Sequence, residues 1–212
     1  MRYPVNMGRP KEHDTETGEA LLDTCEKIIQ ADGMAGLSVR RVADQTGTTT
    51  RAVYAVFGSK EGLIVALGKR AFDLLGRAMD ELPASNDPAR DLVEAGVLVF
   101  RRLTVDHPAL FKIGVQHRDV PVHLMGQFRS AARSALRRLH LRFERLHEHD
   151  ALGRGSIDEE ACQFHALCEG LAALEMRGLL PPGHEERMWR EALSALIDGY
   201  RSQRALKGPS QE

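Results

Sequence analysis

The chain has 212 residues, of which 42% are hydrophobic and 28% charged, and this composition excludes a disordered or low-complexity protein. Aromatic residues are only 5% of the chain, so a core built mostly from Leu, Val and Ala is expected, which favours packed helices over a sandwich of strands. The formal net charge of −1 excludes a globally basic nucleic-acid-binding protein, so any positive charge that serves DNA must be local.

The first residues of the chain are polar, and residues 1–14 are expected to form a mobile arm. Within it, residues 8–12 (GRPKE) place an Arg beside a Pro, a pattern that can insert into a narrow minor groove. A solvated tail with no DNA contact is the alternative. Met7, just before this motif, is an alternative natural start.

Residues 15–75 are predicted to form a helical DNA-binding domain. A first helix over 17–32 has an apolar face at spacings i, i+4, i+7 and i+8, and Gly33 is placed to end it. The turn and capping residues then divide the chain into a helix after Ser38, a turn at Gly47, a short helix from Thr49 to about Phe57, and a long helix from Ser59 to about Leu82.

Two short helices separated by a Gly-containing turn, over residues 38–57, form a helix-turn-helix pattern. The second helix has an outward face of Thr50, Arg51, Tyr54 and Ala55, and it can enter the major groove because these residues are short or polar. Arg51 could pair bidentately with guanine, which is worth ~1–3 kcal/mol of discrimination. Backbone phosphates are the expected targets of Ser38, Arg40, Tyr54 and Lys60. Thr49, at the start of the second helix, is a further candidate DNA-binding residue. The alternative is a plain helical bundle in which Arg51 and Tyr54 are solvated.

The segment 37–64 (LSVRRVADQTGTTTRAVYAVFGSKEGLI) closely resembles the TetR family of one-component repressors. The shared pattern is made by Ser38, Ala43, Gly47, Val53, Tyr54, Phe57, Ser59, Lys60, Glu61 and Leu63. The resemblance implies that Tyr54 and Lys60 contact phosphate, and that Thr50, Arg51 and Ala55 lie nearest the bases. One departure is the run Thr48, Thr49 and Thr50, where the family has an apolar residue and a single capping hydroxyl, so the N-cap is open by one position.

Beyond a connector at 83–88, helices are expected at 88–106, 108–117, 121–149, 157–180 and 184–206. The resemblance implies that 83–207 is an effector-binding and dimerisation domain. Segments 107–116 and 169–180 are similar to the WHG type of C-terminal domain in this family, except that Glu169 stands where that type usually has His.

Two helical faces in this half are candidates for a dimer interface. One is rich in small residues and comprises Gly170, Ala173 and Leu174; the other comprises Trp189, Leu193, Leu196 and Tyr200. A four-helix interface between two copies would suit a palindromic operator. The alternative is that both faces belong to the core of one subunit.

An apolar cavity with a few polar groups is the expected effector site. Its candidate lining residues are Phe100, Leu103, His107, Phe111, Met125, Phe128, Phe164 and Cys168. Plain core packing is the alternative for each of them.

These observations predict a DNA-binding regulator, most simply a repressor that a small-molecule effector releases from a palindromic operator. A constitutive DNA-binding dimer, and an all-helical enzyme or carrier, are the alternatives. No nucleophile–base pattern, phosphate loop or HExxH motif is found, and the cysteines lack metal-ligand spacing, so no catalytic residue, cofactor or metal is predicted. No apolar run fits a signal peptide or a membrane span, so a cytoplasmic protein is expected. The basic run 129–147 is interpreted as a packed helix with a basic solvent face.

Overall fold

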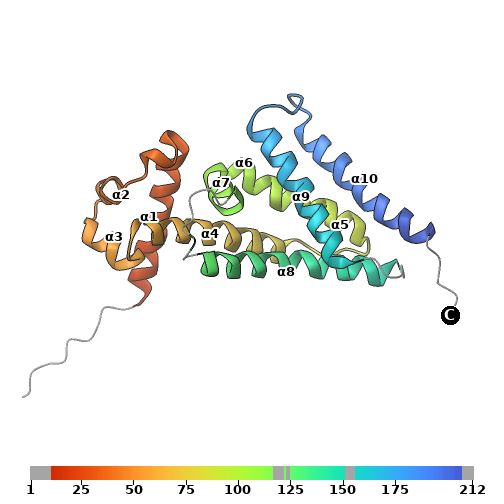
Figure 1. The fold of residues 1–212 in the computed structure, drawn as a ribbon, viewed down its shortest axis with the longest axis horizontal. Helices are drawn as coiled ribbons and strands as arrows, with labels where there is room; N and C mark the ends of the chain where they lie inside the picture. The colour runs from red at the N-terminus through yellow and green to blue at the C-terminus, as the bar shows by residue number, and fades with distance from the viewer. Residues whose placement is uncertain (1–10, 117–121, 123–124, 151–155, 207–212) are drawn as a thin grey trace, which may run out of the picture.

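The computed structural model describes residues 11–116, 122, 125–150 and 156–206. This part of the chain folds into helices and contains no strand, which confirms the predicted all-α class (Figure 1). In chain order the elements are α1 (Lys11–Asp32), η1 (Met34–Gly36), α2 (Val39–Thr46), α3 (Thr50–Phe57), α4 (Lys60–Glu81), α5 (Pro88–Glu94), η2 (Ala95–Arg101), α6 (Arg102–Asp106), α7 (Pro108–Gln116), α8 (Met125–His149), α9 (Ile157–Met176) and α10 (Glu185–Leu206). None of the helices described is long and apolar enough to cross a membrane.

The predicted start of the helix 121–149 lies outside the described residues, and α8 begins at Met125. Three other predicted helices differ from the observed ones. α1 begins at Lys11 rather than at residue 17, so the end of the expected arm is helical, while residues 1–10 lie outside the described part of the chain. The predicted helix 88–106 is continuous, but its middle, η2, is π-helical. α9 ends at Met176 rather than at residue 180, because Gly178 adopts a left-handed φ of 65° that a helix cannot continue through.

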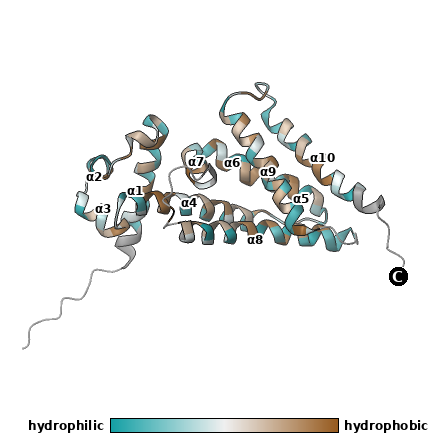
Figure 2. Cartoon of the chain, in the orientation of Figure 1, coloured by the Kyte–Doolittle hydropathy of each residue, from teal (hydrophilic) through white to brown (hydrophobic). Residues whose placement is uncertain are grey.

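The buried apolar residues form two clusters, one at each end of the molecule. The first joins α1, α2, α3 and the first half of α4, and includes Val42 and Val53; the second fills the C-terminal domain around Phe143 and Trp189. Hydrophobic and hydrophilic residues alternate along the helices, so each helix has an apolar face to bury (Figure 2).

α4 contributes to both clusters. Leu63 and Leu67 pack in the first, whereas Leu75 and Met79 pack in the second. Figure 1 shows α4 running from the end formed by α1, α2 and α3 into the C-terminal domain, where it lies along α8. One continuous helix therefore joins the two ends of the molecule.

α7 makes a second connection between the two halves of the chain. Although it follows the connector, its Leu110 and Ile113 are buried in the N-terminal cluster. At the corner before α7, His107 Nδ1 lies 2.6 Å from Glu26 Oε1 on α1. α7 is thus a second physical contact, beside α4, between the C-terminal helices and the N-terminal cluster.

Candidate DNA-binding surface and effector cavity

α2 is held at both ends by its own sequence. The Ser38 side chain accepts a hydrogen bond from the Arg41 backbone N–H at 3.2 Å and caps the helix. At the other end Gly47 takes a left-handed φ of 69°, which favours glycine. Val42 and Ala43 are buried on its inner face. The predicted turn and its geometry are therefore present.

α3 is fixed in a similar way, and the structure settles which threonine caps it. The Thr49 side chain accepts from the Ala52 N–H at 3.2 Å, so Thr49 is the N-cap. Val53, only 1% exposed, anchors α3 to the core, while Phe57 packs against the same cluster from a half-buried position. The orientation of the remaining face of α3 follows from these anchors.

The face of α3 that points away from the core is the predicted one. Thr50, Arg51, Tyr54 and Ala55 are all exposed, and Tyr54 shows 50% of its surface. Such a helix can enter a major groove without removing side chains from the core. The contact of these four residues with bases and phosphates stays a prediction.

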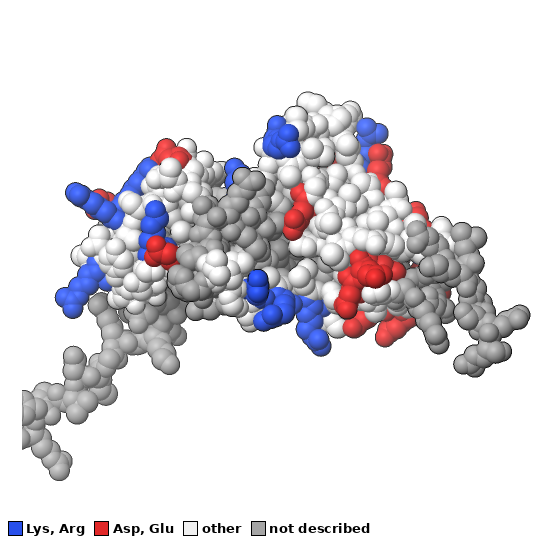
Figure 3. Space-filling model, viewed as in Figure 1, with Lys and Arg blue, Asp and Glu red and all other residues white. Residues whose placement is uncertain are grey.

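The basic residues around this face differ in how far each is paired with a carboxylate. Arg41 is engaged in an ion pair with Asp32 of α1, so part of its charge is already balanced within the domain. Arg40 lies 3.9 Å from Asp44, but both side chains are exposed, which makes this a weak pair. Lys60 is exposed at the first position of α4. On the face shown in Figure 3, Lys and Arg side chains project from the end formed by α2 and α3, and Asp and Glu gather at the opposite end.

The residues predicted for a dimer interface divide into two groups. Trp189 and Leu193 are 0% exposed and Tyr200 is 7% exposed, while Leu196 packs against the C-terminal core. The prediction that this stripe faces a partner is wrong for Trp189, Leu193 and Tyr200, because they fill the core of their own subunit. On α9, Gly170 is exposed, Ala173 is half-buried and Leu174 is 39% exposed. This small-residue face is accessible to a partner.

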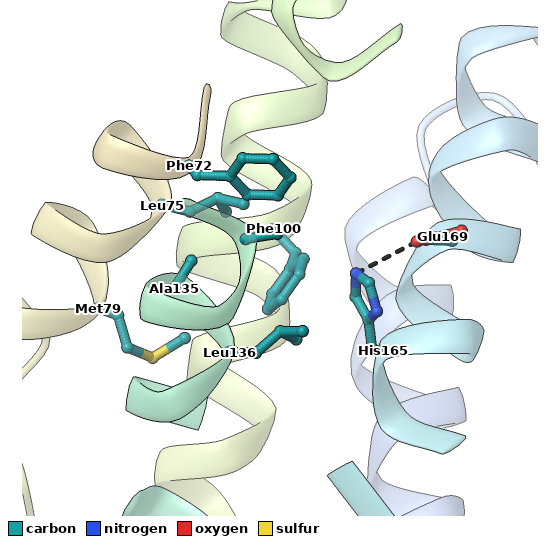
Figure 4. A pocket seen from close by; sticks show the side chains of 9 residues that line it. Phe72, Leu75, Met79, Phe100, Ala135, Leu136, His165 and Glu169 are labelled. Atoms are coloured by element: carbon teal, nitrogen blue, oxygen red, sulfur yellow. Dashed lines mark ion pairs between the residues drawn. The ribbon is translucent and has the colours of Figure 1, made fainter. Parts of the chain in front are cut away.

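A cavity of about 160 Å³ lies between α4, η2, α8 and α9 (Figure 4). Its wall is formed by Phe72, Leu75, Met79, Phe100, Ala132, Ala135, Leu136, His165 and Glu169. His165 Nε2 and Glu169 Oε1, one turn apart on α9, lie 3.2 Å from each other and bring ionisable groups to a wall that is otherwise apolar. The cavity has the apolar lining and few polar groups of a small-molecule site.

Of the eight residues predicted to line an effector pocket, Phe100 lies in the wall of this cavity. The others lie elsewhere: Leu103, Phe111, Phe128, Phe164 and Cys168 are buried in the C-terminal cluster, Met125 is half-buried at the start of α8, and His107 is at the junction with α1. Phe128 and Phe164 pack edge-to-face against Phe72 and Phe100, so they support the wall from behind. Burial raises the pKa of the Cys168 thiol, which therefore stays protonated.

Sequence reasoning missed the α4 residues of the cavity because it searched only beyond the connector. A signal was available: Phe72, Leu75 and Met79 recur at i, i+3 and i+7 on the long helix predicted from Ser59 to about Leu82. It also left His165 and Glu169 out of the pocket, although Glu169 marks the departure from the WHG pattern.

This arrangement defines a class of protein: a capped helix-turn-helix exposed at one end, joined by a long helix to an all-helical domain with a largely apolar cavity. Residues 21–67 match the model of the family described as bacterial regulatory proteins, tetR family. The N-terminal helices of this chain are therefore similar to the DNA-binding part of that family.

One curated relative is similar to about half of the chain. The HTH-type transcriptional regulator EthR of Mycolicibacterium smegmatis is 30% identical over 112 residues, which are 51% of this chain and 49% of the relative. The chain thus matches about half the length of this curated relative.

Solved structures share the fold across nearly the whole chain at low identity. FadR from Bacillus subtilis, in complex with stearoyl-CoA, is 15% identical with a TM-score of 0.72, covering 85% of this chain and 98% of that one. The TetR-family regulator PfmR from Thermus thermophilus is 16% identical with a TM-score of 0.67, covering 84% and 97%. These likenesses extend the shared fold from the helix-turn-helix to the C-terminal domain.

Proposed function

We propose that this protein is a sequence-specific DNA-binding transcriptional repressor. It acts as a homodimer on a palindromic operator in the cytoplasm, by binding alone and without catalysis. The observation that carries the proposal is the exposed side chain of Arg51 on a helix whose start is capped by Thr49 and whose inner face is anchored by Val53. A guanidinium presented on a rigid helix is suited to a guanine edge in the major groove.

Two subunits related by a two-fold axis would place two copies of α3 in successive major grooves, ~34–36 Å or a multiple apart. The cavity is the proposed effector site, because three of its wall residues, Phe72, Leu75 and Met79, belong to α4. A molecule that binds better when α4 is displaced shifts the population towards a dimer with the wrong spacing. The operator is then released.

The proposal is tested by selecting DNA with the purified protein and measuring the affinity for the selected operator and for mutated half-sites. Arg51→Ala is expected to reduce the discrimination between these sites by about 5-fold to 150-fold, while the protein stays folded and dimeric. Arg137→Ala, at an exposed position of α8 remote from α3, is the matched control and should retain full discrimination. Unchanged specificity in Arg51→Ala would overturn the role assigned to this residue.

A further inference from the structure

The wall of the cavity carries information on the kind of molecule it accepts, and the inference below rests on the effector site proposed above. The side chains on α4, η2 and α8 are aliphatic, aromatic or thioether groups, as Figure 4 shows for Phe72, Met79 and Leu136. The ionisable groups of the wall, His165 and Glu169, both come from α9 and lie on one side of it. A ligand is therefore met by apolar surface on most sides and by polar groups on one.

The volume limits the size of the ligand. The cavity measures about 160 Å³, and a cavity of about 150 Å³ lined by aliphatic and aromatic residues is known to accommodate benzene. One ring with a short substituent fills such a space. A long acyl chain such as that of the stearoyl-CoA bound to FadR does not fit.

The polar side of the wall limits the chemistry. The Glu169 side chain is 41% exposed and that of His165 is 26% exposed, so the polar groups lie where the cavity meets solvent. His165 is already paired with Glu169, Nε2 to Oε1 at 3.2 Å, and the Glu169 carboxylate offers further hydrogen-bond acceptors and a negative charge. A ligand carboxylate placed beside it would be repelled, whereas an N–H or O–H group would be bound.

We infer that the cavity binds a compact, largely apolar molecule of about one aromatic ring, which carries a single hydrogen-bond donor, an amine or a hydroxyl, and no carboxylate. The ring lies against Phe72 and Phe100, where edge-to-face contact with aromatic side chains is available. The donor points to Glu169 on α9. Such a ligand links α9 to α4 across the cavity, which gives it contacts with the helix that leads to the DNA-binding domain.

Four probes of nearly equal size separate the possibilities: benzylamine, benzyl alcohol, toluene and benzoate. Binding to the full-length protein is measured by isothermal titration calorimetry, without DNA. Benzylamine and benzyl alcohol are expected to bind about tenfold more tightly than toluene, and benzoate more weakly than all three, because only the first two donate a hydrogen bond to Glu169. The comparison of benzylamine with benzyl alcohol shows whether an ammonium or a hydroxyl group is the preferred donor.

Two variants test whether Glu169 and the cavity are responsible. Glu169→Leu is expected to remove the preference for donors, so that toluene binds at least as well as benzyl alcohol. Ala135→Leu, which fills the cavity, should abolish binding of every probe. Glu144→Gln, at an exposed carboxylate of α8 outside the cavity, serves as the control and should bind all probes as the wild type does.

The ligand class and the proposed function fail in different ways. Equal or tighter binding of benzoate, an unchanged order of affinities in Glu169→Leu, or no binding of any probe by a protein that still binds its operator would overturn the ligand class alone. Failure of the wild type to select any DNA sequence would overturn the proposed function, whatever the calorimetry shows.

Discussion

The guanidinium of Arg142 on α8 donates a hydrogen bond to the backbone carbonyl oxygen of Met79 on α4, at 2.8 Å. The same nitrogen lies 2.7 Å from the carbonyl oxygen of Leu82. These carbonyls belong to the end of α4, where the helix itself provides no further N–H donor. Because the Met79 side chain also lines the cavity, Arg142 fixes the end of α4 directly beside the proposed effector site.

Replacing Arg142 is therefore expected to weaken the fold. Arg142→Ala removes two charge-assisted hydrogen bonds from a residue that is only 8% exposed, and the free energy of unfolding should fall by about 3 kcal/mol. Urea denaturation followed by circular dichroism measures this. Arg137→Ala, at an exposed position of the same helix, should change the stability by no more than about 0.5 kcal/mol. Equal stabilities of the two variants would contradict the structural role of Arg142.

The function of Arg142 could not be predicted from its sequence context. The run 129–147 reads as an amphipathic helix, and its apolar stripe is indeed packed, with Leu139 and Phe143 buried. Three of its arginines are not simply solvated, however: Arg138 bonds Asp80, Arg142 bonds the end of α4, and Arg145 bonds Asp91. Periodicity identifies the buried face of a helix, but it does not reveal which carbonyl or carboxylate lies opposite a basic side chain.

A glycine in η2 is expected to be essential for packing. A Cβ added at Gly96 would lie 2.2 Å from Cδ1 of Leu193 on α10, and Leu193 is fully buried and cannot move aside. Gly96→Ala should lower the free energy of unfolding by about 1–3 kcal/mol through overpacking, as thermal or urea denaturation would show.

Gly18→Ala in α1 is the matched comparison. Its added Cβ would make an ordinary contact of 3.7 Å with Val56, and alanine is the better helix former, so a gain of up to about 1 kcal/mol is expected. A loss of the same size in both variants would point to a general cost of replacing glycine rather than to crowding at Gly96.

The π-helical form of η2 illustrates another limit of sequence reasoning. The surrounding positions, including Leu92, Val97, Val99 and Phe100, are nearly all buried, so no polar face remains to reveal the helical period. The DNA-binding domain behaves differently, since its caps and turns are local. The roles of Ser38, Gly47 and Thr49 follow from side-chain or backbone preferences within a few residues, and the structure confirms them. The cavity depends on four elements that are distant in sequence, which local preferences do not specify.

Lys60 is expected to contribute affinity without specificity. It is exposed at the start of α4, beside the end of α3, where it can reach a phosphate. Lys60→Ala should weaken binding to the operator and to unrelated DNA by similar factors, and lower the slope of log affinity against log salt by about 1. Fluorescence anisotropy at several salt concentrations measures both. Lys69→Ala should have no such effect, because Lys69 is already paired with Asp73 at 2.7 Å. A loss confined to the operator would assign Lys60 to base contacts instead.

The exposed face of α9 is expected to form the dimer contact. Leu174 is 39% exposed and follows the small residues Gly170 and Ala173. Leu174→Glu should raise the dimer dissociation constant at least about tenfold, because a charge in the middle of an interface loses its solvation. Leu98→Glu replaces a residue of equal exposure on η2 and should leave the dimer intact. Analytical ultracentrifugation of both variants over a range of concentrations measures the dimer dissociation constants. If Leu98→Glu dissociates and Leu174→Glu does not, the interface lies at η2 instead.

Asp91 lies on α5 and holds Ser85 of the connector through hydrogen bonds. This carboxyl is expected to make the stability of the protein depend on pH. Burial raises the pKa of this carboxyl, but hydrogen bonds from Ser85 and the Arg145 guanidinium outweigh burial and hold the pKa below its usual value. A carboxyl whose pKa is lowered by folding stabilises the protein fully above its unfolded pKa of about 3.9, and this contribution is lost as the pH falls through the lower, folded value.

Asp91→Asn keeps the size of the side chain and removes its charge. The variant should be less stable than the wild type by about 1–3 kcal/mol near neutral pH, and the difference should shrink as the pH falls below about 4. Urea denaturation at pH 7 and at pH 3 measures it. Asp198→Asn, at a side chain that is 70% exposed, should stay within about 0.5 kcal/mol of the wild type at both values. A difference for Asp91→Asn that is the same at pH 7 and pH 3 would mean that its hydrogen-bonding shape, and not its charge, holds the connector.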